Sequence, residues 1–229
     1  MFLLFAILPG VFLVWLVYSM DKIEKEPKGF LTKLFFWGAF TCVPILFVEL
    51  AFMAVIGKSV GGSKYVLAAA KAYLVAGLVE ETFKYLFLKW KTWKSPEFNY
   101  TFDGVVYAVV VSMGYATLEN ILYVCSVPKI STVVVRAVLS VPGHAIFGVF
   151  MGANYGLAKL CERYNDTNGR DKNLRRAWLY AIFLHGTYDF CLMTGDAIIV
   201  LPSILFELGF TVRVYKKLKL LAGADRRLM

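Results

Sequence analysis

Long apolar stretches recur along almost the whole chain, and they constrain its fold more than any other feature. A helix needs about 20 predominantly apolar residues to cross the roughly 30 Å hydrocarbon core of a bilayer. Stretches of this length predict seven spans, at residues 2–20, 30–56, 66–89, 101–126, 131–160, 173–193 and 196–215. Hydrophobic residues make up 59% of the chain, more than the roughly 45–50% of a soluble domain. The sequence therefore predicts an all-α, polytopic transmembrane helix bundle.

The first apolar stretch has the length of a secretory signal, but its flanks differ from one. It has no basic segment before it and no small-x-small cleavage pattern before Asp21, so we interpret it as a membrane helix. No connection is long enough to hold a soluble domain, and we find no internal repeat. We therefore expect residues 1–229 to form a single integral membrane domain.

The basic residues are distributed unevenly between the connections, and this predicts the topology. The odd-numbered connections and the C-terminal tail hold 19 of the 25 Lys and Arg residues, whereas the even-numbered ones hold only Lys58, Lys64, Lys129 and Arg136. Because positive charge favours the cytoplasmic side, the N-terminus is expected outside and the C-terminus in the cytoplasm. The net charge of +9 then reflects topology and attraction to anionic lipid, and no nucleic-acid partner is expected.

The four cysteines, Cys42, Cys125, Cys161 and Cys191, are scattered and form no C-x-x-C pair. Neither a disulfide framework nor a zinc-ribbon site is indicated.

Two adjacent glutamates and a lysine interrupt the third span. Glu80 lies nine residues from both Lys71 and Lys89, about 13–14 Å from either flank and thus near the middle of the membrane. Lys84 follows Glu80 by four residues and Glu81 by three, so it can reach either carboxylate. A structural Glu–Lys pair would need only one glutamate. The second one favours a functional site, since intramembrane charges are costly.

The fourth span carries Glu119 and Asn120 in its outer half, ten and nine residues before Lys129. A structural alternative is an interhelical hydrogen bond that joins two helices. Asp103, at the cytoplasmic start of the same span, is expected to be a helix cap.

Both histidines of the chain lie inside predicted spans. His144 shares one helix face with Gly148, Gly152 and Gly156, and such a glycine ladder lets a neighbouring helix approach closely. His144 is therefore expected to face the bundle interior. His185 has Asp189 four residues on, where a carboxylate can orient an imidazole and stabilise its cation.

Four spans thus bring polar groups to one depth, in the middle to outer half of the membrane, as in a water-containing catalytic cavity. No serine is paired recognisably with a lysine or histidine, and neither Gly-x-Gly-Asp nor His-Glu-x-x-His occurs. The residues therefore favour carboxylate–histidine chemistry, with or without a metal.

These motifs, taken together and in order, resemble the PrsW family of intramembrane proteases. The resemblance rests on Glu80-Glu-Thr-Phe-Lys84, Phe102-Asp-Gly104 with Tyr107, Gly114 to Asn120, His144 to Gly148, His185 to Phe190, and the Asp21…Glu26-Pro27 connection. It implies a multi-pass protein of the bacterial plasma membrane. Its implied partner is a membrane-spanning anti-sigma factor, cut on its extracytoplasmic side to start a signalling cascade. The distantly related CAAX prenyl protease superfamily carries Glu-Glu-x-x-x-Arg, whereas here a lysine comes one position earlier.

The hypothesis from these residues is hydrolysis by a glutamate-activated water without an obligate cofactor. Glu80 is the general base, assigned by analogy with the related superfamily, and Glu81 lies beside it. His144 stabilises the oxyanion with Glu119 or Asn120. His185, oriented by Asp189, holds the water or protonates the leaving amine, and Lys84 determines which glutamate carries the charge.

Three alternatives stay open at this point. The first is a metallopeptidase with Zn²⁺ bound by His144, His185 and Glu80. The second is a non-proteolytic transporter or proton channel, and the third is a bis-histidine haem protein.

Overall fold

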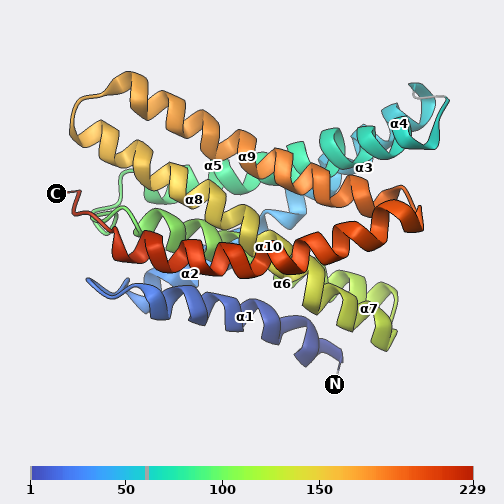
Figure 1. Cartoon of the computed structure of the whole chain (residues 1–229), viewed down its shortest axis with the longest axis horizontal. Coiled ribbons are helices and arrows are strands. Elements are labelled where there is room, and N and C mark those ends of the chain that lie inside the picture. Colours follow the sequence, from blue (N-terminus) through green and yellow to red (C-terminus); the bar gives the residue numbers. More distant parts are fainter. Residues whose placement is uncertain (1, 60–61, 229) are drawn as a thin grey trace.

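The computed structural model describes residues 2–59 and 62–228 and is built from helices (Figure 1). In chain order these are α1 (Phe2–Met20), α2 (Lys28–Phe40), α3 (Cys42–Ser59), α4 (Lys64–Ala69), the π-helix η1 (Ala70–Glu80), α5 (Glu81–Thr92), α6 (Asp103–Ser126), α7 (Ile130–Val135), the π-helix η2 (Arg136–Ser140), α8 (Val141–Arg163), α9 (Thr167–Met193) and α10 (Ala197–Gly223). Among the described residues, extended pairing is limited to one bridge between Tyr100 and Arg227. The all-α prediction is confirmed.

Helical segments cover all seven predicted spans, because α4, η1 and α5 follow one another directly, as do α7, η2 and α8. Five segments of the described chain are long and apolar enough to cross a membrane: Leu3–Met20, Lys28–Ile56, Asp103–Ser126, Ile130–Arg163 and Ala197–Gly223. The third and sixth predicted spans are helical but not among these five. The third carries the charges of Glu80, Glu81 and Lys84. The sixth corresponds to α9, whose first ten residues include several basic ones. The span count of seven and the orientation remain predictions.

Helix α6 lies at the centre of the bundle, between α2 and α8. From Asp103 to Thr117 all of its residues are buried, and most of them are apolar or small, as a helix enclosed by its neighbours requires. Small residues set the spacing: a Cβ added at Gly152 of α8 would lie 2.5 Å from the Val105 Cα of α6. A Cβ at Gly148 would lie 3.1 Å from the Val109 Cα. The prediction that the glycine ladder faces another helix is therefore confirmed, and that helix is α6.

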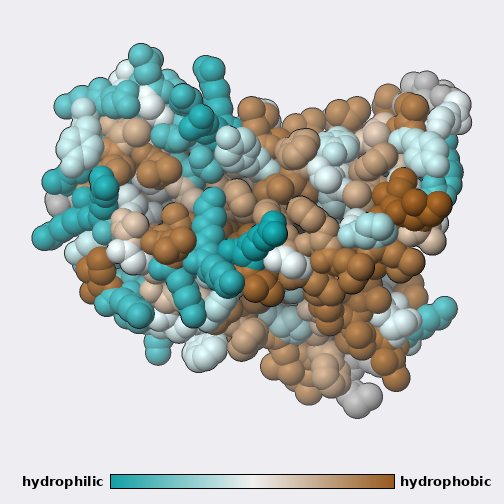
Figure 2. Space-filling model, viewed as in Figure 1, coloured by the Kyte–Doolittle hydropathy of each residue, from teal (hydrophilic) through white to brown (hydrophobic). Residues whose placement is uncertain are grey.

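Polar residues gather at one end of the molecule. In Figure 1 the C-terminus and the connection between α8 and α9 lie at this end, while the N-terminus and α7 lie at the other. Figure 2 shows hydrophilic residues concentrated on the C-terminal end and mainly hydrophobic ones over the other half of this face, with a few hydrophilic residues at its far edge. This arrangement agrees with the uneven charge distribution that predicts a cytoplasmic C-terminus.

The polar end is tied together by the C-terminal tail. Asp225 accepts hydrogen bonds from the Thr101 hydroxyl and the Phe102 amide, each at 2.8 Å, just before α6. Asp103 lies inside the first turn of α6 and accepts from the amides of Asn99 and Tyr100. The expectation that Asp103 caps α6 is therefore wrong: it fastens the preceding loop, and the tail carboxylate bonds the amide ahead of the helix.

Two carboxyl groups in the connection between α1 and α2 are buried at this same end. Burial raises the pKa of Asp21 to about 6, with Lys25 opposing the shift. Burial also raises the pKa of Glu26 to about 7, against the hydrogen bond from Tyr107.

Candidate active site

Glu80 and Glu81 lie where the backbone of the third helical segment changes its winding. Residues 70–80 form a π-helix, which gives way to α-helix at Glu81. Such π segments are frequent at functional sites because they alter which side chains share a face. Both glutamates point into the bundle, with 4% and 0% of their surface exposed.

Lys84 joins the two glutamates, as the spacing predicts. Its Nζ lies 3.0 Å from Glu80 Oε2 and 2.8 Å from Glu81 Oε1, and the side chain is completely buried. The same Nζ is 3.3 Å from His144 Nδ1. Because an ammonium only donates, Nδ1 accepts, and the ring proton of a neutral His144 is left on Nε2.

His185 brings α9 to the same point. Its Nδ1 lies 2.9 Å from Glu81 Oε1 and 3.8 Å from Glu80 Oε2, while its Nε2 lies 3.5 Å from Asp189 Oδ2. The predicted pairing with Asp189 is thus present. With a carboxylate at each nitrogen, the doubly protonated imidazolium is the favoured form.

Close packing of α9 against η1 makes this approach of His185 feasible. A Cβ at Gly77 would lie 2.9 Å from the carbonyl oxygen of Ile182, so only glycine fits there. The Tyr73 and Thr187 hydroxyls are 2.8 Å apart across the same contact. Glycine at 77 therefore places His185 within reach of the paired glutamates.

His144 and Glu119 bring α8 and α6 to the cluster. His144 Nε2, the nitrogen that the contact with Lys84 leaves protonated, lies 3.2 Å from Glu119 Oε2. The two imidazoles are in edge-to-face contact, with ring centroids 5.1 Å apart. Four helical segments thus converge, as the sequence predicts.

Asn120 belongs to a neighbouring network instead of the histidine cluster. Its Nδ2 donates to the Ala6 carbonyl oxygen and its Oδ1 accepts from Arg136 Nε, each at 2.8 Å. Both atoms of its amide are therefore engaged with α1 and η2. Asn120 holds helices together, which is the structural alternative considered for this pair of residues, whereas Glu119 contacts a histidine.

The sequence reasoning missed several residues around the site. Arg136, counted there as a loop charge, bonds Glu119 Oε2 through its guanidinium. The Tyr115 ring lies under Lys84 Nζ, 3.9 Å from its centroid, and Phe147 stacks on His185. Glu49 of α3 is close enough for its charge to interact with those of Glu80 and Glu119. Arg136 and Glu49 both fall inside predicted apolar spans, which is the signal that could have revealed them.

The charges of the cluster do not balance, and this has a chemical consequence. Among the groups joined by ion pairs, four carboxylates (Glu80, Glu81, Glu119 and Asp189) face three cationic groups (Lys84, Arg136 and an imidazolium at His185). Glu81 receives both Lys84 and His185 at hydrogen-bond distance, whereas Glu80 has only Lys84 that close. Glu80 is therefore the carboxylate most free to take a proton.

Exposure of the cluster is graded from one side to the other. The side chains of Glu119 and Asp189 are 19% and 18% exposed, while those of Glu80 and Lys84 are at most 5% exposed. The cluster is therefore most accessible at Glu119 and Asp189.

The donor atoms fit a metal ion in type and spacing. One ligand atom from each of Glu80, Glu81, His144 and His185 can be chosen so that all four lie within 4.8 Å of one another. Two imidazoles with carboxylates are a set that suits Zn²⁺. Glu81 Oε2, moreover, is buried without a hydrogen-bond partner. Against this, the Lys84 ammonium already contacts three of the four residues.

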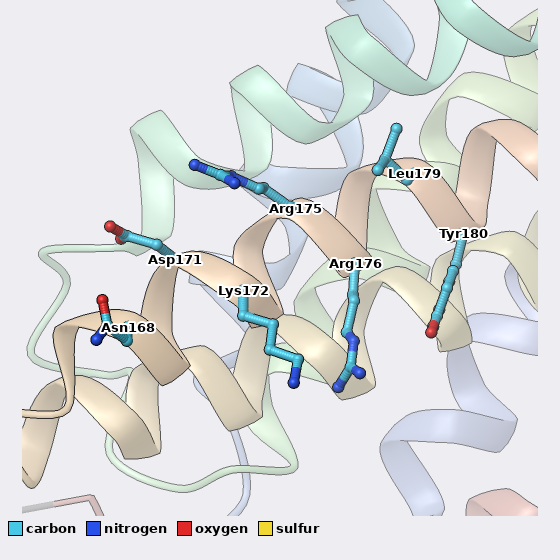
Figure 3. Close-up of a pocket in the computed structure, with 7 residues that line it drawn as sticks. All are labelled: Asn168, Asp171, Lys172, Arg175, Arg176, Leu179 and Tyr180. Carbon is cyan, nitrogen blue, oxygen red and sulfur yellow. The ribbon is translucent and has the colours of Figure 1, made fainter.

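A separate pocket of about 340 Å³ opens on the polar half of α9. Figure 3 shows its lining residues, Asn168, Asp171, Lys172, Arg175, Arg176, Leu179 and Tyr180. Arg176 lies nine residues from His185, about 14 Å along the helix. The pocket holds none of the clustered carboxylates or histidines, and its basic lining is typical of a surface near anionic lipid headgroups.

Comparison with known proteins assigns the chain to a family. Residues 26–214 match the family model described as PrsW family intramembrane metalloprotease. The chain is 36% identical to Protease PrsW of Geobacillus kaustophilus over 83% of its length and 79% of the relative's. It is 33% identical to Protease PrsW of Bacillus subtilis over 93% of both chains. No solved structure matches it. The chain therefore belongs to the PrsW family of intramembrane proteases.

Proposed function

We propose that this chain hydrolyses a peptide bond of a membrane-spanning protein with a water activated by Glu80. The observation that carries the proposal is the fully buried cluster of Glu80, Glu81, Lys84, His144 and His185. Ionisable groups are costly inside a membrane, so a cluster of this size needs a function. Peptide hydrolysis is the function that the protease relatives favour.

Glu80 is the proposed general base. It is the less bonded glutamate of the pair and keeps a small exposed fraction, whereas Glu81 is completely buried and doubly bonded. Lys84 and His185 hold Glu81 ionised, and its charge favours proton uptake by Glu80. The assignment of the base to Glu80 thus has a geometric reason beside the analogy.

The two histidines are proposed to serve opposite ends of the scissile bond. His144 points its Nε2 proton toward Glu119, the more open side of the cluster, where a substrate carbonyl can take Glu119's place. From there it stabilises the oxyanion. His185, held by Asp189 and Glu81, carries the proton that the leaving amine needs. Asn120 is left out of this scheme because its amide is occupied by Ala6 and Arg136.

The alternative is a metallopeptidase that uses the same residues. His144, His185 and Glu80, with Glu81 close by, would hold Zn²⁺. A bound zinc ion would supply Lewis acidity and lower the pKa of a coordinated water. In the favoured scheme, Lys84 provides the fixed positive charge at this position.

The proposed substrate is an anti-sigma factor in a bacterial plasma membrane, an assignment that comes from the family resemblance. Cleavage on the extracytoplasmic side fits the proposed orientation, because Glu119 and Asp189 are the more exposed members of the cluster and lie in the later turns of α6 and α9, far from the start of each helix at the polar end. Such a cut would begin the release of a sigma factor.

Reconstitution with candidate single-span anti-sigma factors tests the proposal. Glu80→Gln, Glu81→Gln and His144→Ala are compared with the wild type for cleavage products in liposomes. Loss of a general base should lower the rate by about 10²–10⁴-fold in Glu80→Gln. A matched control is Glu162→Gln, which alters a partly exposed pair with Lys159 at the basic end and should cleave normally. Undiminished cleavage by Glu80→Gln would remove the proposed base.

A further inference from the structure

A second group of buried carboxylates lies outside the candidate active site, at the polar end of the molecule. It comprises Asp21 and Glu26, from the connection between α1 and α2, and Asp103 in the first turn of α6. One oxygen from each can be chosen so that all three lie within 4.8 Å of one another. Their residues are 1%, 3% and 0% exposed. We call this group the tripartite carboxylate site.

The donors that bond these carboxylates are a hydroxyl and backbone amides, and the carboxyl groups of Glu26 and Asp103 also lie within hydrogen-bond reach of each other. Glu26 Oε2 accepts from the Tyr107 hydroxyl at 2.6 Å. Asp103 Oδ2 accepts from the amides of Asn99 and Tyr100 at 3.0 and 2.6 Å. No ion pair within residues 2–59 and 62–228 includes any of the three carboxylates. Lys25, the adjacent cation in the sequence, donates to the Tyr18 carbonyl oxygen instead.

Unpaired acceptor oxygens collect at the same place. In the described part of the chain, Asp21 Oδ2 and Asp103 Oδ1 are buried without a hydrogen-bond partner, and each belongs to a residue that is at least 99% buried. The side-chain oxygen Oδ1 of Asn99 is also buried and unpaired, and the backbone amide of the same residue donates to Asp103. Buried acceptors without a donor are costly, and several in one place require something that neutralises them. A cation from solution meets this need directly.

We propose that Asp21, Glu26 and Asp103 bind a divalent cation of the hard, oxygen-preferring class, Mg²⁺ or Ca²⁺. The three ligand groups are carboxylates only, which suit such cations, whereas the imidazole-containing cluster around Glu80 suits zinc. The unpaired Oδ2 of Asp21 and Oδ1 of Asp103 provide ligand atoms that no other contact uses.

Binding has a structural consequence, because the ligands come from two separate segments. The cation links the connection between α1 and α2 to the start of α6. The C-terminal tail is bonded to the same region through Asp225 and through the amide of Leu228, which donates to the Asn99 carbonyl oxygen. A cation here links the first two of these parts, and the hydrogen bonds of the tail add the third.

The test uses the full chain in detergent after removal of divalent ions. Apparent melting temperature is measured against Mg²⁺ and Ca²⁺ in separate titrations, and binding of Mn²⁺ is followed by electron paramagnetic resonance with Mg²⁺ as competitor. The wild type should show a saturable rise in melting temperature, since a ligand of the folded state stabilises it. It should also bind Mn²⁺ that excess Mg²⁺ displaces.

Two variants locate the site. Asp103→Asn keeps an oxygen for the amides of Asn99 and Tyr100 and replaces the unpaired oxygen by an NH₂ group, and Asp21→Asn removes the other unpaired carboxylate oxygen. Each should weaken the apparent affinity by roughly tenfold or more. His185→Ala, in the other cluster, should leave Mn²⁺ binding intact.

Three results would overturn the proposal: absence of displaceable Mn²⁺ in the wild type, loss of Mn²⁺ binding in His185→Ala, or unchanged affinity in both aspartate variants. The first two use no tripartite-site substitution, so they decide the matter even if both aspartate variants fail to fold.

Discussion

The molecule buries two groups of carboxylates, and they are neutralised in different ways. Around Glu80, the chain supplies its own cations, with Lys84 in contact with both glutamates and His185 between two carboxylates. In the tripartite carboxylate site, Asp21 and Asp103 keep unpaired oxygens, and none of the ion pairs in the described part of the chain includes them. The first cluster lacks one positive charge, which suits proton transfer. The second lacks all of its positive charge, which suits a bound ion.

The largest expected effect comes from removing the cation of the first cluster. Lys84→Met leaves two buried glutamates without their shared partner, and breaking a buried pair from one side costs about 3–5 kcal/mol. We expect a clear fall in the apparent melting temperature and loss of cleavage. Adding Glu81→Gln to this variant should restore part of the stability.

Lys159→Met is the matched control for this change. Lys159 pairs with Glu162 at 2.6 Å, but both side chains are partly exposed. Such pairs contribute about 0–1 kcal/mol, so the melting temperature should barely change. Equal melting temperatures for Lys84→Met and the wild type would mean that the glutamates are not held ionised by Lys84.

The helix that carries residues of both clusters is the next target. Asp103 and Glu119 both belong to α6, which α8 approaches through Gly152. Gly152→Ala places a methyl group 2.5 Å from the Val105 Cα, and overpacking of this kind costs about 1–3 kcal/mol. Thermal unfolding should register the loss. Gly209→Ala on α10 meets no atom within 4 Å and should be neutral or slightly stabilising, by up to about 1 kcal/mol.

Two adjacent residues of α6, Glu119 and Asn120, are expected to differ in role: one takes part in catalysis and the other holds helices together. Glu119→Gln weakens the contact with His144, and we expect the turnover number to fall about 10–100-fold, as for other carboxylate partners of functional histidines. Asn120→Ala removes bonds to Ala6 and Arg136, so it should lower the melting temperature more than the turnover number. The reverse pattern would give Asn120 the oxyanion role.

The last comparison has the smallest expected effect and tests whether the negative charge of the tripartite carboxylate site is left uncompensated by the chain. Because burial raises the pKa of Glu26 to about 7, the folded state holds this proton more tightly than the unfolded chain does. The stabilisation from Glu26 is therefore full below the unfolded pKa and is lost as the pH rises through about 7.

Glu26→Gln keeps an acceptor for Tyr107 and removes this ionisation. At pH 8 in a chelating buffer we expect the variant to be more stable than the wild type, because only the wild type then carries a buried charge at this position. Excess Mg²⁺ should reverse the order of the two melting temperatures. A variant that is less stable in both buffers would contradict this charge accounting.

The parts of the fold and of the candidate active site that could be predicted from sequence are those that depend on local spacing. Apolar length located the helices, and the intervals from Glu80 and Glu81 to Lys84 and from His185 to Asp189 fixed contacts within one helix. The glycine ladder predicted that His144 faces a neighbouring helix.

Contacts between helices depended on packing that no interval encodes. Nothing in the spacing shows that His185 bonds Glu81 more closely than Glu80, or that Asn120 turns to the Ala6 carbonyl. The position of Asp103 at the start of α6 predicted a helix cap. The prediction failed because the C-terminal tail, more than 100 positions away, bonds the residues just before the helix. Arg136 and Glu49 were overlooked although intramembrane charge marks them both.

Metal content and activity, measured on the same preparation, test the central claim most directly. The protein is stripped of zinc with a chelator, its zinc is quantified, and cleavage of a reconstituted single-span substrate is followed. If Glu80 activates water with Lys84 as the fixed positive charge, cleavage continues at far less than one zinc per chain, and Glu80→Gln slows it by about 10²–10⁴-fold. Cleavage that stops on zinc removal and returns with stoichiometric zinc would contradict the account and assign the cluster to a metallopeptidase.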